Sequence, residues 1–470
     1  MERLFDLSKF DSNIALIEGD NTYTYSDLEG YSDEIAHKIG VRTLCMIMTT
    51  NTYASVAGYV GCLNNGIVPI LIDSHLHQDM IMNLLELYRP PFVWCPSKAV
   101  SKFGEGYTEI YSSNEYTLLG NGSNDCEMYD DLALLITTSG STGSPKLVRQ
   151  SYKNIEANTK SIVSYLEITS EERGITSLPM NYVYGLSVLN THLYTGASIV
   201  LTSLNCYTPK FWKHFNEKEA TSFSGVPFMY EMINKLDVMN SVELPTLKTM
   251  TQAGGKLSVE LHEKFAGFAH DTGRKFVVMY GASEATARMG YLPAKDAVQK
   301  MGSMGIAIPG GRFELIDEEG NVIEDSEKVG ELVYYGDNVT LGYALSGKDL
   351  IKGDENEGRL ITGDMAKRDA DGYYYVVGRK KRFVKMVGKR LNLDELEAAI
   401  KKEFQITDVA CAGIDDKLNV FITDKQLEKS VNDFVFGKIG LSRGLYKTVT
   451  IDEIPKNPSG KTMYAQLKIQ

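Results

Sequence analysis

A loop rich in hydroxyl groups and glycine occupies residues 134–151, LLITTSGSTGSPKLVRQS, where an apolar run gives way to small residues and then to Pro145 and Lys146. Such a loop can wrap a polyphosphate, because hydroxyls and backbone N–H groups bind phosphate oxygens and glycine permits a close approach. It is not a G-x-x-x-x-G-K-[ST] loop, since Pro145 stands where the second glycine is needed after Gly140. Clusters of Ser, Thr and Gly are also typical of surface linkers, so this stretch alone leaves both interpretations open.

Further motifs follow in order along nearly the whole chain and favour the phosphate-binding interpretation. They are TYTYSDLEGYSDEIAHKI (22–39), GCLNNGIVPILID (61–73), LPMNYVYGL (178–186), TQAGGKL (251–257), YGASEAT (280–286), GELVYYGDNVTLGY (330–343), TGD (362–364), GRKKRFVKMVGKR (378–390) and NPSGK (457–461). Together with TTSGSTGSPK they resemble the adenylate-forming enzymes, the superfamily of acyl-CoA synthetases, peptide-synthetase adenylation domains and firefly luciferase.

The resemblance implies a reaction in which a carboxylate oxygen attacks the α-phosphorus of ATP, giving an acyl-adenylate and pyrophosphate. Because two anions meet, the site must neutralise charge and hold an in-line geometry. On this resemblance the loop would bind the β- and γ-phosphates and the leaving pyrophosphate. The loop residues concerned are Thr138, Ser139, Gly140, Ser141, Thr142, Gly143 and Lys146.

The motif YGASEAT would supply the metal and adenine contacts. Glu284 would hold Mg²⁺, which prefers carboxylate and phosphate oxygens. Ser283 replaces the family's usual threonine and keeps a hydroxyl that can reach phosphate, and Tyr280 would stack on adenine. Taken singly, these residues could also be an exposed loop acid and a buried core tyrosine. The glycines that complete the nucleotide-binding set are Gly254, Gly255 and Gly281.

The later motifs would supply the remaining functional groups. Asp364 would accept hydrogen bonds from the ribose hydroxyls, and Arg379 would contact ribose or phosphate; a turn or helix-capping aspartate is the alternative for Asp364. Lys381 aligns with the hinge about which the small domain rotates between two half-reactions. Lys461 would be the catalytic cation of adenylation, and the alternative is an ordinary surface lysine. Lys385, with Gly388, aligns with positions that face the thioester site, while the rest of the basic stretch also suits a solvated strand face.

The sequence departs from the family in ways that bear on the substrate. Tyr182 stands where acyl-CoA synthetases commonly have histidine, which puts the usual acyl-to-pantetheine switching in doubt. The same motif has no aspartate to pair with a substrate ammonium, and because a buried unpaired ammonium is costly, an α-amino acid is disfavoured. The remaining pocket candidates are mostly apolar and aromatic, which favours an aryl, fatty or other neutral organic acid. They are Tyr182, Tyr184, Ser224, Val226, Phe228 and Ala282.

The bulk composition excludes some function classes. The chain has 470 residues, 43% hydrophobic and 23% charged, which is typical of a globular protein with two or three domains. Its 49 basic and 61 acidic residues give a net charge of −12, which disfavours nucleic acid as a partner. We find no signal-peptide pattern and no run long enough to span a membrane, and the six cysteines are scattered, so we expect a cytoplasmic protein with reduced thiols and no membrane insertion.

The pattern of elements predicts an α/β fold. Strand-like runs such as 67–73, 174–179 and 275–281 alternate with amphipathic helical segments such as 25–39 and 152–166, which indicates α/β layers with a partly parallel sheet. From about Gly302 the pattern becomes rich in strands. We predict a large N-terminal domain, 1–380, of layered α/β subdomains and a β-rich subdomain, and a small mobile α+β C-terminal domain, 381–470. In that small domain an insertion familiar from the family is missing after DVACAGIDD.

The sequence therefore predicts an ATP- and Mg²⁺-dependent acid-thiol ligase. It would form an acyl-adenylate and transfer the acyl group to a pantetheine thiol, either CoA or the phosphopantetheine of a holo-carrier protein. The alternatives are an amino-acid adenylating ligase and a non-catalytic nucleotide-binding homologue, against which Glu284, Asp364, Arg379 and Lys461 argue. The oligomeric state is expected to be monomer or homodimer.

Overall fold

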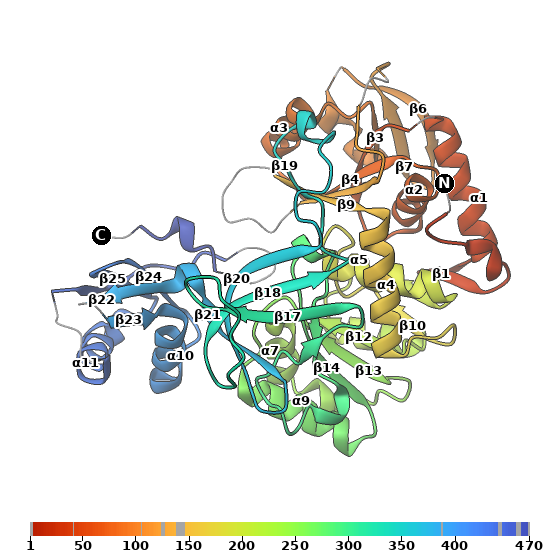
Figure 1. Ribbon diagram of the computed structural model, residues 1–470. Helices are drawn as coiled ribbons and strands as arrows, with labels where there is room; N and C mark the ends of the chain where they lie inside the picture. The colour runs from red at the N-terminus through yellow and green to blue at the C-terminus, as the bar shows by residue number, and fades with distance from the viewer. Residues whose placement is uncertain are drawn as a thin grey trace. The chain divides into compact units, whose positions relative to one another are not determined.

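The computed structural model (Figure 1) describes residues 3–40, 42–104, 106–123, 127–137, 146–386, 389–439, 444–456 and 462–468, without the side chains of Lys385, Lys389, Arg390, Lys438 and Ile439. The chain divides into two compact units. The first draws on residues 1–138, 144–312 and 334–360, and the second includes 313–333 and 361–470. The domain boundary predicted at residue 380 stays a prediction.

The largest sheet of the first unit has eight strands in the order β19-β9-β8-β4-β3-β5-β7-β6, with β8, β4, β3 and β5 parallel. Every residue of β3 is buried, because helices cover both faces. Cys45 and Ile47 pack with residues of α1 and α2, whereas the alternate residues Met46 and Met48 pack with α3. The strands are Gly342–Ala344, Leu147–Ser151, Leu132–Thr137, Val68–Asp73, Leu44–Thr49, Phe92–Pro96, Tyr116–Gly120 and Thr108–Ser113 in sheet order.

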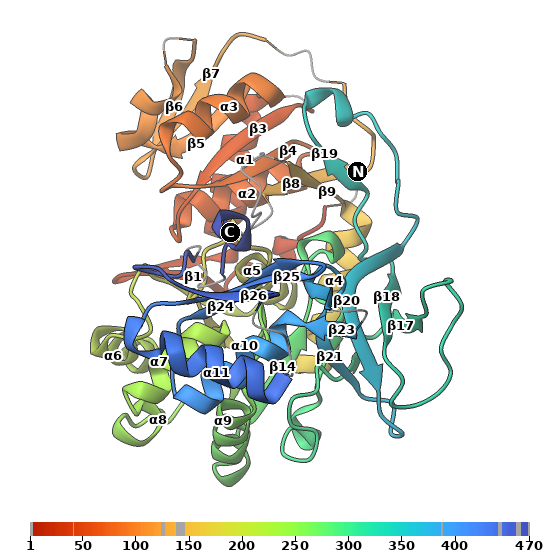
Figure 2. The same ribbon diagram turned by 90° about the vertical axis from the view of Figure 1, so that its left-hand side faces the viewer.

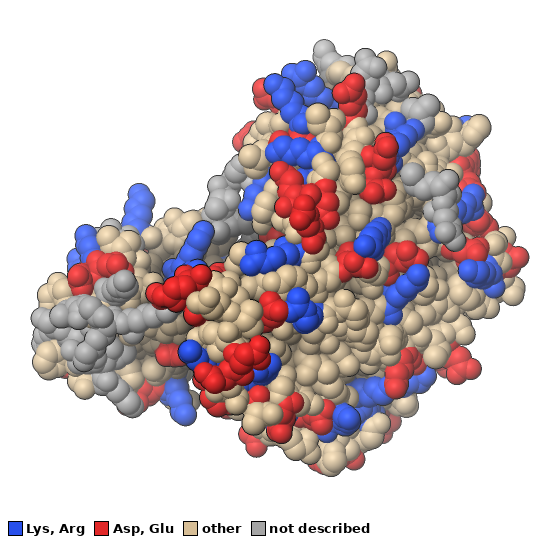
Figure 3. Space-filling view, viewed as in Figure 1, with Lys and Arg blue, Asp and Glu red and all other residues tan. Residues whose placement is uncertain are grey.

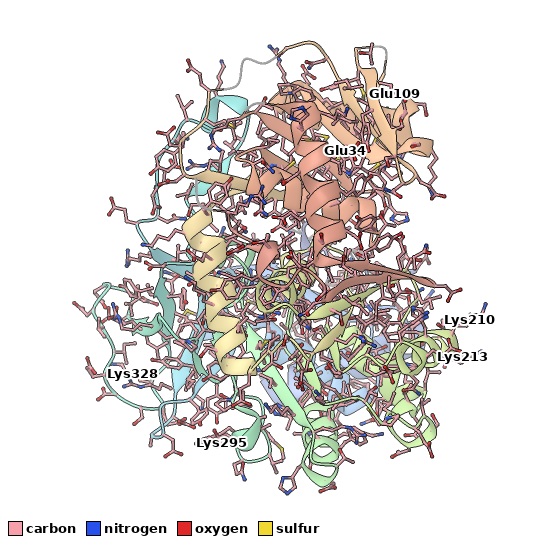
Figure 4. All side chains as sticks on the ribbon, turned by 90° about the vertical axis from the view of Figure 1, so that its right-hand side faces the viewer. Glu34, Glu109, Lys210, Lys213, Lys295 and Lys328 are labelled. Atoms are coloured by element: carbon pink, nitrogen blue, oxygen red, sulfur yellow. The ribbon has the colours of Figure 1, made fainter. Side chains whose placement is uncertain are left out.

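A second sheet of five strands, β12-β13-β14-β15-β16, begins with three parallel strands. Amphipathic helices pack around it. In α6, Phe211, Trp212 and Phe215 are buried, whereas Lys210 and Lys213 point outward (Figure 4). The strands are Ser222–Gly225, Thr249–Gln252, Lys275–Tyr280, Gly290–Tyr291 and Ile306–Ala307.

The third sheet has the order β10-β11-β1-β2, and its strands are Arg173–Ile175, Ser198–Leu201, Ile14–Glu18 and Asn21–Thr24. The α-helices of the first unit are α1 Tyr25–Ile39, α2 Tyr53–Asn64, α3 Gln78–Tyr88, α4 Tyr152–Leu166, α5 Val183–Thr195, α6 Pro209–Glu217, α7 Pro227–Lys235, α8 Val238–Ser241 and α9 Val259–Asp271. Capping boxes start α1 at Thr24 and α4 at Ser151, which confirms the helices predicted at 25–39 and 152–166.

The strand predicted at 174–179 is wrong beyond Ile175. The Thr176 hydroxyl donates to Thr202 O at 3.1 Å, and the Ser177 hydroxyl donates to Ser224 O at 2.5 Å. These bonds turn the chain away from the sheet, and Pro179 brings no N–H that could extend the ladder.

The second unit contains two main sheets. The order β17-β18-β20-β21 lies mostly in this unit, and its strands are Gly311–Ile316, Gly330–Gly336, Arg359–Arg368 and Tyr374–Arg379. The sheet β24-β25-β26 carries α10 and α11 on one face (Figure 2), and Cys411 and Val420 pack with these helices while Ala410 and Phe421 face a smaller cluster. The remaining elements are β22 Phe383–Met386, β23 Lys389–Asn392, α10 Leu393–Phe404, β24 Val409–Ile414, β25 Lys417–Ile422, α11 Glu428–Ile439 and β26 Tyr446–Thr450.

The charges on the surface and the lengths of the helices are relevant to binding partners and to membrane insertion. Within the described ranges, no helix combines the length and the apolar character that crossing a bilayer requires. On the face shown in Figure 3, acidic and basic side chains are interspersed among the coloured atoms. The α/β fold class predicted from the sequence is confirmed by these layers.

Candidate active site

The loop that follows β14, residues 281–288, carries Glu284 in a short 3₁₀ turn, Ser283–Ala285. The chain reverses here, so that β15 pairs antiparallel with β14. A Cβ on Gly281 would lie 1.6 Å from the Ala287 carbonyl oxygen, so the reversal requires glycine at this position. Thr286 and Ala287 have φ values of +56° and +124°, a conformation that residues with a side chain rarely adopt and that clusters at functional sites.

A second segment holds this loop in place. The Asn338 side-chain amide donates to the carbonyls of Ala285 and Arg288, both at 2.8 Å. Thr340 donates to the Glu284 carbonyl from its backbone N–H and from its hydroxyl, both at 3.0 Å. The motif 330–343, to which the sequence assigned no role, thus braces the residue predicted to bind Mg²⁺.

Tyr343 joins two of the predicted nucleotide-binding residues. Its hydroxyl donates to the Glu284 carboxylate, and the Lys146 Nζ lies 3.8 Å from the centroid of its ring. The register explains this, because Tyr343 in β19 pairs with Val148 in β9, two residues after Lys146. One aromatic side chain therefore contacts both a cation at the end of the predicted phosphate loop and the Glu284 carboxylate.

The carboxylate oxygens of Glu284 are suited to bind a magnesium ion. Mg²⁺ is usually bound by one or two carboxylates together with substrate phosphates and water. In the described part of the chain, no group of three or more His, Cys, Asp and Glu side chains could form a metal cage. A Mg²⁺ at this position would take Glu284 as its protein ligand and its other oxygens from phosphate and water.

Some predicted residues lie outside the described residues. They are the loop residues Thr138, Ser139, Gly140, Ser141, Thr142 and Gly143, together with Gly388 and Lys461, and of Lys385 only the backbone, in β22, is described. Their roles stay predictions.

The predicted acid pocket is partly assembled in the first unit. The Tyr184 hydroxyl lies 2.8 Å from Thr251 Oγ1, which lies 2.9 Å from Ser224 Oγ. A Cβ on Gly254 would lie 2.4 Å from the Tyr182 hydroxyl and 3.1 Å from Val226, so glycine lets this backbone approach both side chains. Burial raises the pKa of Tyr184 to about 12, so its hydroxyl stays neutral at physiological pH.

The other predicted pocket and adenine residues are less enclosed. Tyr280 ends β14 half-buried, and Ala282 precedes the 3₁₀ turn. A Cβ on Gly255 would meet Pro227 at 3.2 Å. Phe228 is 44% exposed, with its ring 6.4 Å from that of Tyr207, and its role in the acid pocket stays a prediction.

The two residues predicted to contact ribose lie side by side in the second unit. Asp364 in β20 pairs with Arg379 in β21, and Arg379 Nε lies 2.9 Å from Asp364 Oδ1. Asp364 is buried while Arg379 is exposed. Next along the chain, the Lys380 ammonium pairs with Glu331 at 2.7 Å, and Lys381 lies in a 3₁₀ turn.

Comparison with known proteins now identifies the family. The model of the family described as "AMP-binding enzyme" matches residues 6–344. The chain belongs to this AMP-binding family. The match confirms the resemblance predicted from the motifs.

Similar proteins are named as CoA ligases. A peroxisomal OPC-8:0-CoA ligase of Arabidopsis thaliana is 29% identical over 350 residues, covering 72% of this chain and 64% of that protein. The 2-succinylbenzoate–CoA ligase of Bacillus subtilis (strain 168) is 24% identical over 470 residues, covering 97% and 94%. Over the first plant relatives the alignment thus spans less than two thirds of their length, 64% and 61%.

Solved structures of AMP-binding enzymes share the fold. The O-succinylbenzoate coenzyme A synthetase of Bacillus subtilis in complex with AMP superposes with a TM-score of 0.80 at 21% identity, covering 100% of this chain and 98% of that chain. ATP-bound MatB from Rhodopseudomonas palustris gives a TM-score of 0.82 at 20% identity, covering 98% and 96%. At these identities the likeness establishes the fold alone.

The sequence did not single out several residues that build this site. Tyr343, Asn338 and Thr340 belong to the motif 330–343, for which the sequence predicts no role. Arg288 was also missed, although a charged residue flanked by Ala287 and Met289, four positions after Glu284, is an available signal.

Proposed function

We propose that this AMP-binding protein is an ATP-dependent carboxylic acid ligase that forms an acyl-adenylate with release of pyrophosphate and then transfers the acyl group to the thiol of CoA. The observation that carries the proposal is the set Lys146, Tyr343 and Glu284. It joins the end of the predicted phosphate loop to a carboxylate suited to Mg²⁺.

The residues of this chain divide the work of the first step. Lys146 lies where its charge can attract the phosphates of ATP, and the Tyr343 hydroxyl fixes one oxygen of Glu284. When bound, Mg²⁺ would offset charge on those phosphates. Asn338 and Thr340 keep the loop in its strained path, which keeps Glu284 in place before substrate arrives.

The remaining roles rest on the sequence. Lys461 would stabilise the transition state in which the carboxylate attacks the α-phosphorus. Asp364 and Arg379 would contact the ribose, and the segment after Lys381 would rotate before thioester formation, in which Lys385 faces the thiol site. CoA is favoured as acceptor because the relatives that align are named as CoA ligases. Transfer of the acyl group to a holo-carrier protein stays a prediction. The oligomeric state, monomer or homodimer, and the cytoplasmic location also stay predictions.

Acid-dependent release of pyrophosphate tests the proposal. With Mg·ATP, a panel of aryl, fatty, dicarboxylic and amino acids should give pyrophosphate only with particular acids. Adding CoA should then give an acyl-CoA of the expected mass. A kinase would give ADP, and a non-catalytic homologue neither product. If no acid gives pyrophosphate, the proposed function is wrong.

A further inference from the structure

Arg288 is a buried cation at the end of the loop that carries Glu284. Its side chain is 2% exposed. The guanidinium lies 4.0 Å from the centroid of the Tyr184 ring, and its Nε donates to the Met279 sulfur at 3.3 Å. Among the residues that the structure describes, no carboxylate lies within ion-pair distance of it.

The tyrosine hydroxyls near Arg288 do not supply the missing negative charge. Burial raises the pKa of Tyr165 and of Tyr184, and the Arg288 charge opposes the rise only in part. Both hydroxyls are therefore neutral at physiological pH. Every partner that the described residues give this guanidinium is neutral, although burying an uncompensated charge is costly.

Another buried arginine of the same unit, Arg149, has a carboxylate partner. Arg149 is 0% exposed, pairs with the Glu355 carboxylate, and donates to the carbonyls of Leu341, Tyr343 and Gly353 at 2.8, 3.2 and 3.1 Å. Arg149 has what a structural buried arginine requires. Among the residues that the structure describes, Arg288 has no such carboxylate.

A cavity of about 120 Å³ adjoins Arg288, and residues of α4, α5 and the strands β12 and β13 contribute to its lining. This volume far exceeds the roughly 10–15 Å³ that one water needs. Ser224 and Thr251, which connect to Tyr184 by hydrogen bonds, belong to its lining. Ser224, one of the residues predicted to line the acid pocket, therefore lines this cavity as well.

The other charged side chains of the lining neutralise one another. Lys248 lies 3.1 Å from Glu172, and Lys275 pairs with Glu167. Arg288 leaves one positive charge in excess. One arginine fork matches one carboxylate, whereas a phosphate monoester would bring nearly two negative charges.

From this geometry we infer that the acid activated by this enzyme carries a second carboxylate, which binds Arg288 while the first reacts. This inference rests on the proposed function and narrows its substrate class. The aromatic side chains Tyr182 and Tyr184 still favour an aryl or aliphatic body, now with a second acidic end. Arg288 is thus a specificity-determining residue.

Matched pairs of acids test the inference in the pyrophosphate assay. The pairs are adipate with hexanoate, adipate with its monomethyl ester, and terephthalate with 4-methylbenzoate. The wild-type enzyme should favour the diacid by about tenfold or more in kcat/KM, the range expected for one charge-assisted hydrogen bond. Arg288→Met should remove or reverse this preference, and Arg288→Lys should keep part of it.

Arg312→Met is the matched control, because its guanidinium also lies over a tyrosine ring, Tyr335, at 4.2 Å, but it is exposed and is not among the cavity residues. It should leave the diacid preference intact. Circular dichroism and thermal unfolding check that each variant folds. A wild-type enzyme that favours the monocarboxylate of each pair, or an Arg288→Met variant that is folded and keeps the diacid preference, overturns the inference but not the proposed function.

Isothermal titration calorimetry tests the binding of the second carboxylate to Arg288 independently of turnover. Adipate and terephthalate are titrated into wild type and into Arg288→Met in the presence of Mg²⁺ and a non-hydrolysable ATP analogue. Binding that requires Arg288 supports the inference even if no acid gives pyrophosphate, in which case only the proposed function fails. Absence of binding, or equal binding by both proteins, overturns the inference.

Discussion

Tyr343 connects two parts of the site through two different chemical groups. Its ring faces the Lys146 ammonium and its hydroxyl donates to Glu284. A hydrogen bond from a hydroxyl to a charged acceptor stabilises a protein by about 1.5–3 kcal/mol, and a cation over an aromatic ring stabilises it by about 0.5–2 kcal/mol. The two contributions can be separated, because phenylalanine keeps the ring and loses the hydroxyl.

We therefore expect Tyr343→Phe to lower kcat/KM for Mg·ATP by about tenfold or more. Tyr343→Leu, which also loses the ring, should lower it further. Initial rates of pyrophosphate release at varied Mg·ATP measure both effects. Tyr335→Phe is the control, since the Tyr335 ring also faces a guanidinium but its hydroxyl accepts a hydrogen bond from Arg359. Equal rates for Tyr343→Phe and wild type would show that the Tyr343 hydroxyl has no role in the reaction.

Lys461 lies outside the described residues, and its role rests on the resemblance. Removing a positioned cation that stabilises developing charge typically costs a factor of about 10²–10³. Lys461→Ala should lose at least that much pyrophosphate exchange while ATP binding and fold stay largely intact. Lys468→Ala, an exposed lysine of the same terminal segment, should exchange at the wild-type rate. An exchange rate near wild type in Lys461→Ala refutes the assignment.

At the scale of elements, the loop after β14 depends on Gly281. A Cβ there would lie 1.6 Å from a backbone oxygen, which cannot move aside as a flexible side chain can. Gly281→Ala should therefore destabilise the first unit by about 2 kcal/mol or more and displace Glu284 and Arg288. Thermal unfolding and pyrophosphate release measure the two effects.

The control for Gly281→Ala is Gly267→Ala in α9. A Cβ on Gly267 would meet nothing within 4 Å, and alanine in a helix is favoured over glycine by about 0.5–1 kcal/mol. This variant should be slightly more stable than wild type with unchanged activity. If Gly281→Ala behaves like Gly267→Ala, the tight reversal does not govern the site.

The elements best predicted from the sequence are those specified locally. Capping residues and a 3.6-residue period give the bounds of α1 and α4, whereas the strand after Ile175 ends through bonds to Thr202 and Ser224, which are distant in sequence. The same distinction applies to the site. Glu284 was found through its motif. Tyr343 reaches it through the β9–β19 register, and Arg288 is notable because no described carboxylate pairs with it, and neither fact is local.

At the scale of the whole molecule, the family resemblance predicts that the two half-reactions of the proposed function use different arrangements of the C-terminal segment, with the pivot at Lys381. In the described structure Lys381 lies in a 3₁₀ turn, Lys380–Arg382, between β21 and β22. The preceding residue, Lys380, pairs with Glu331. Proline at 381 would fix φ near −65° and disfavour the helical conformation of Lys380. Rotation about this point would then be restricted.

Lys381→Pro should therefore lower thioester formation by about tenfold or more while pyrophosphate release changes much less, because only the second step needs the rotation. Single-turnover experiments with a preformed acyl-adenylate and CoA isolate that step. Lys381→Ala, which removes the ammonium and leaves φ free, should carry out both steps at near wild-type rates. If the proline variant loses both steps equally, the pivot does not lie at Lys381, and a loss shared by the alanine variant would instead assign the effect to the charge.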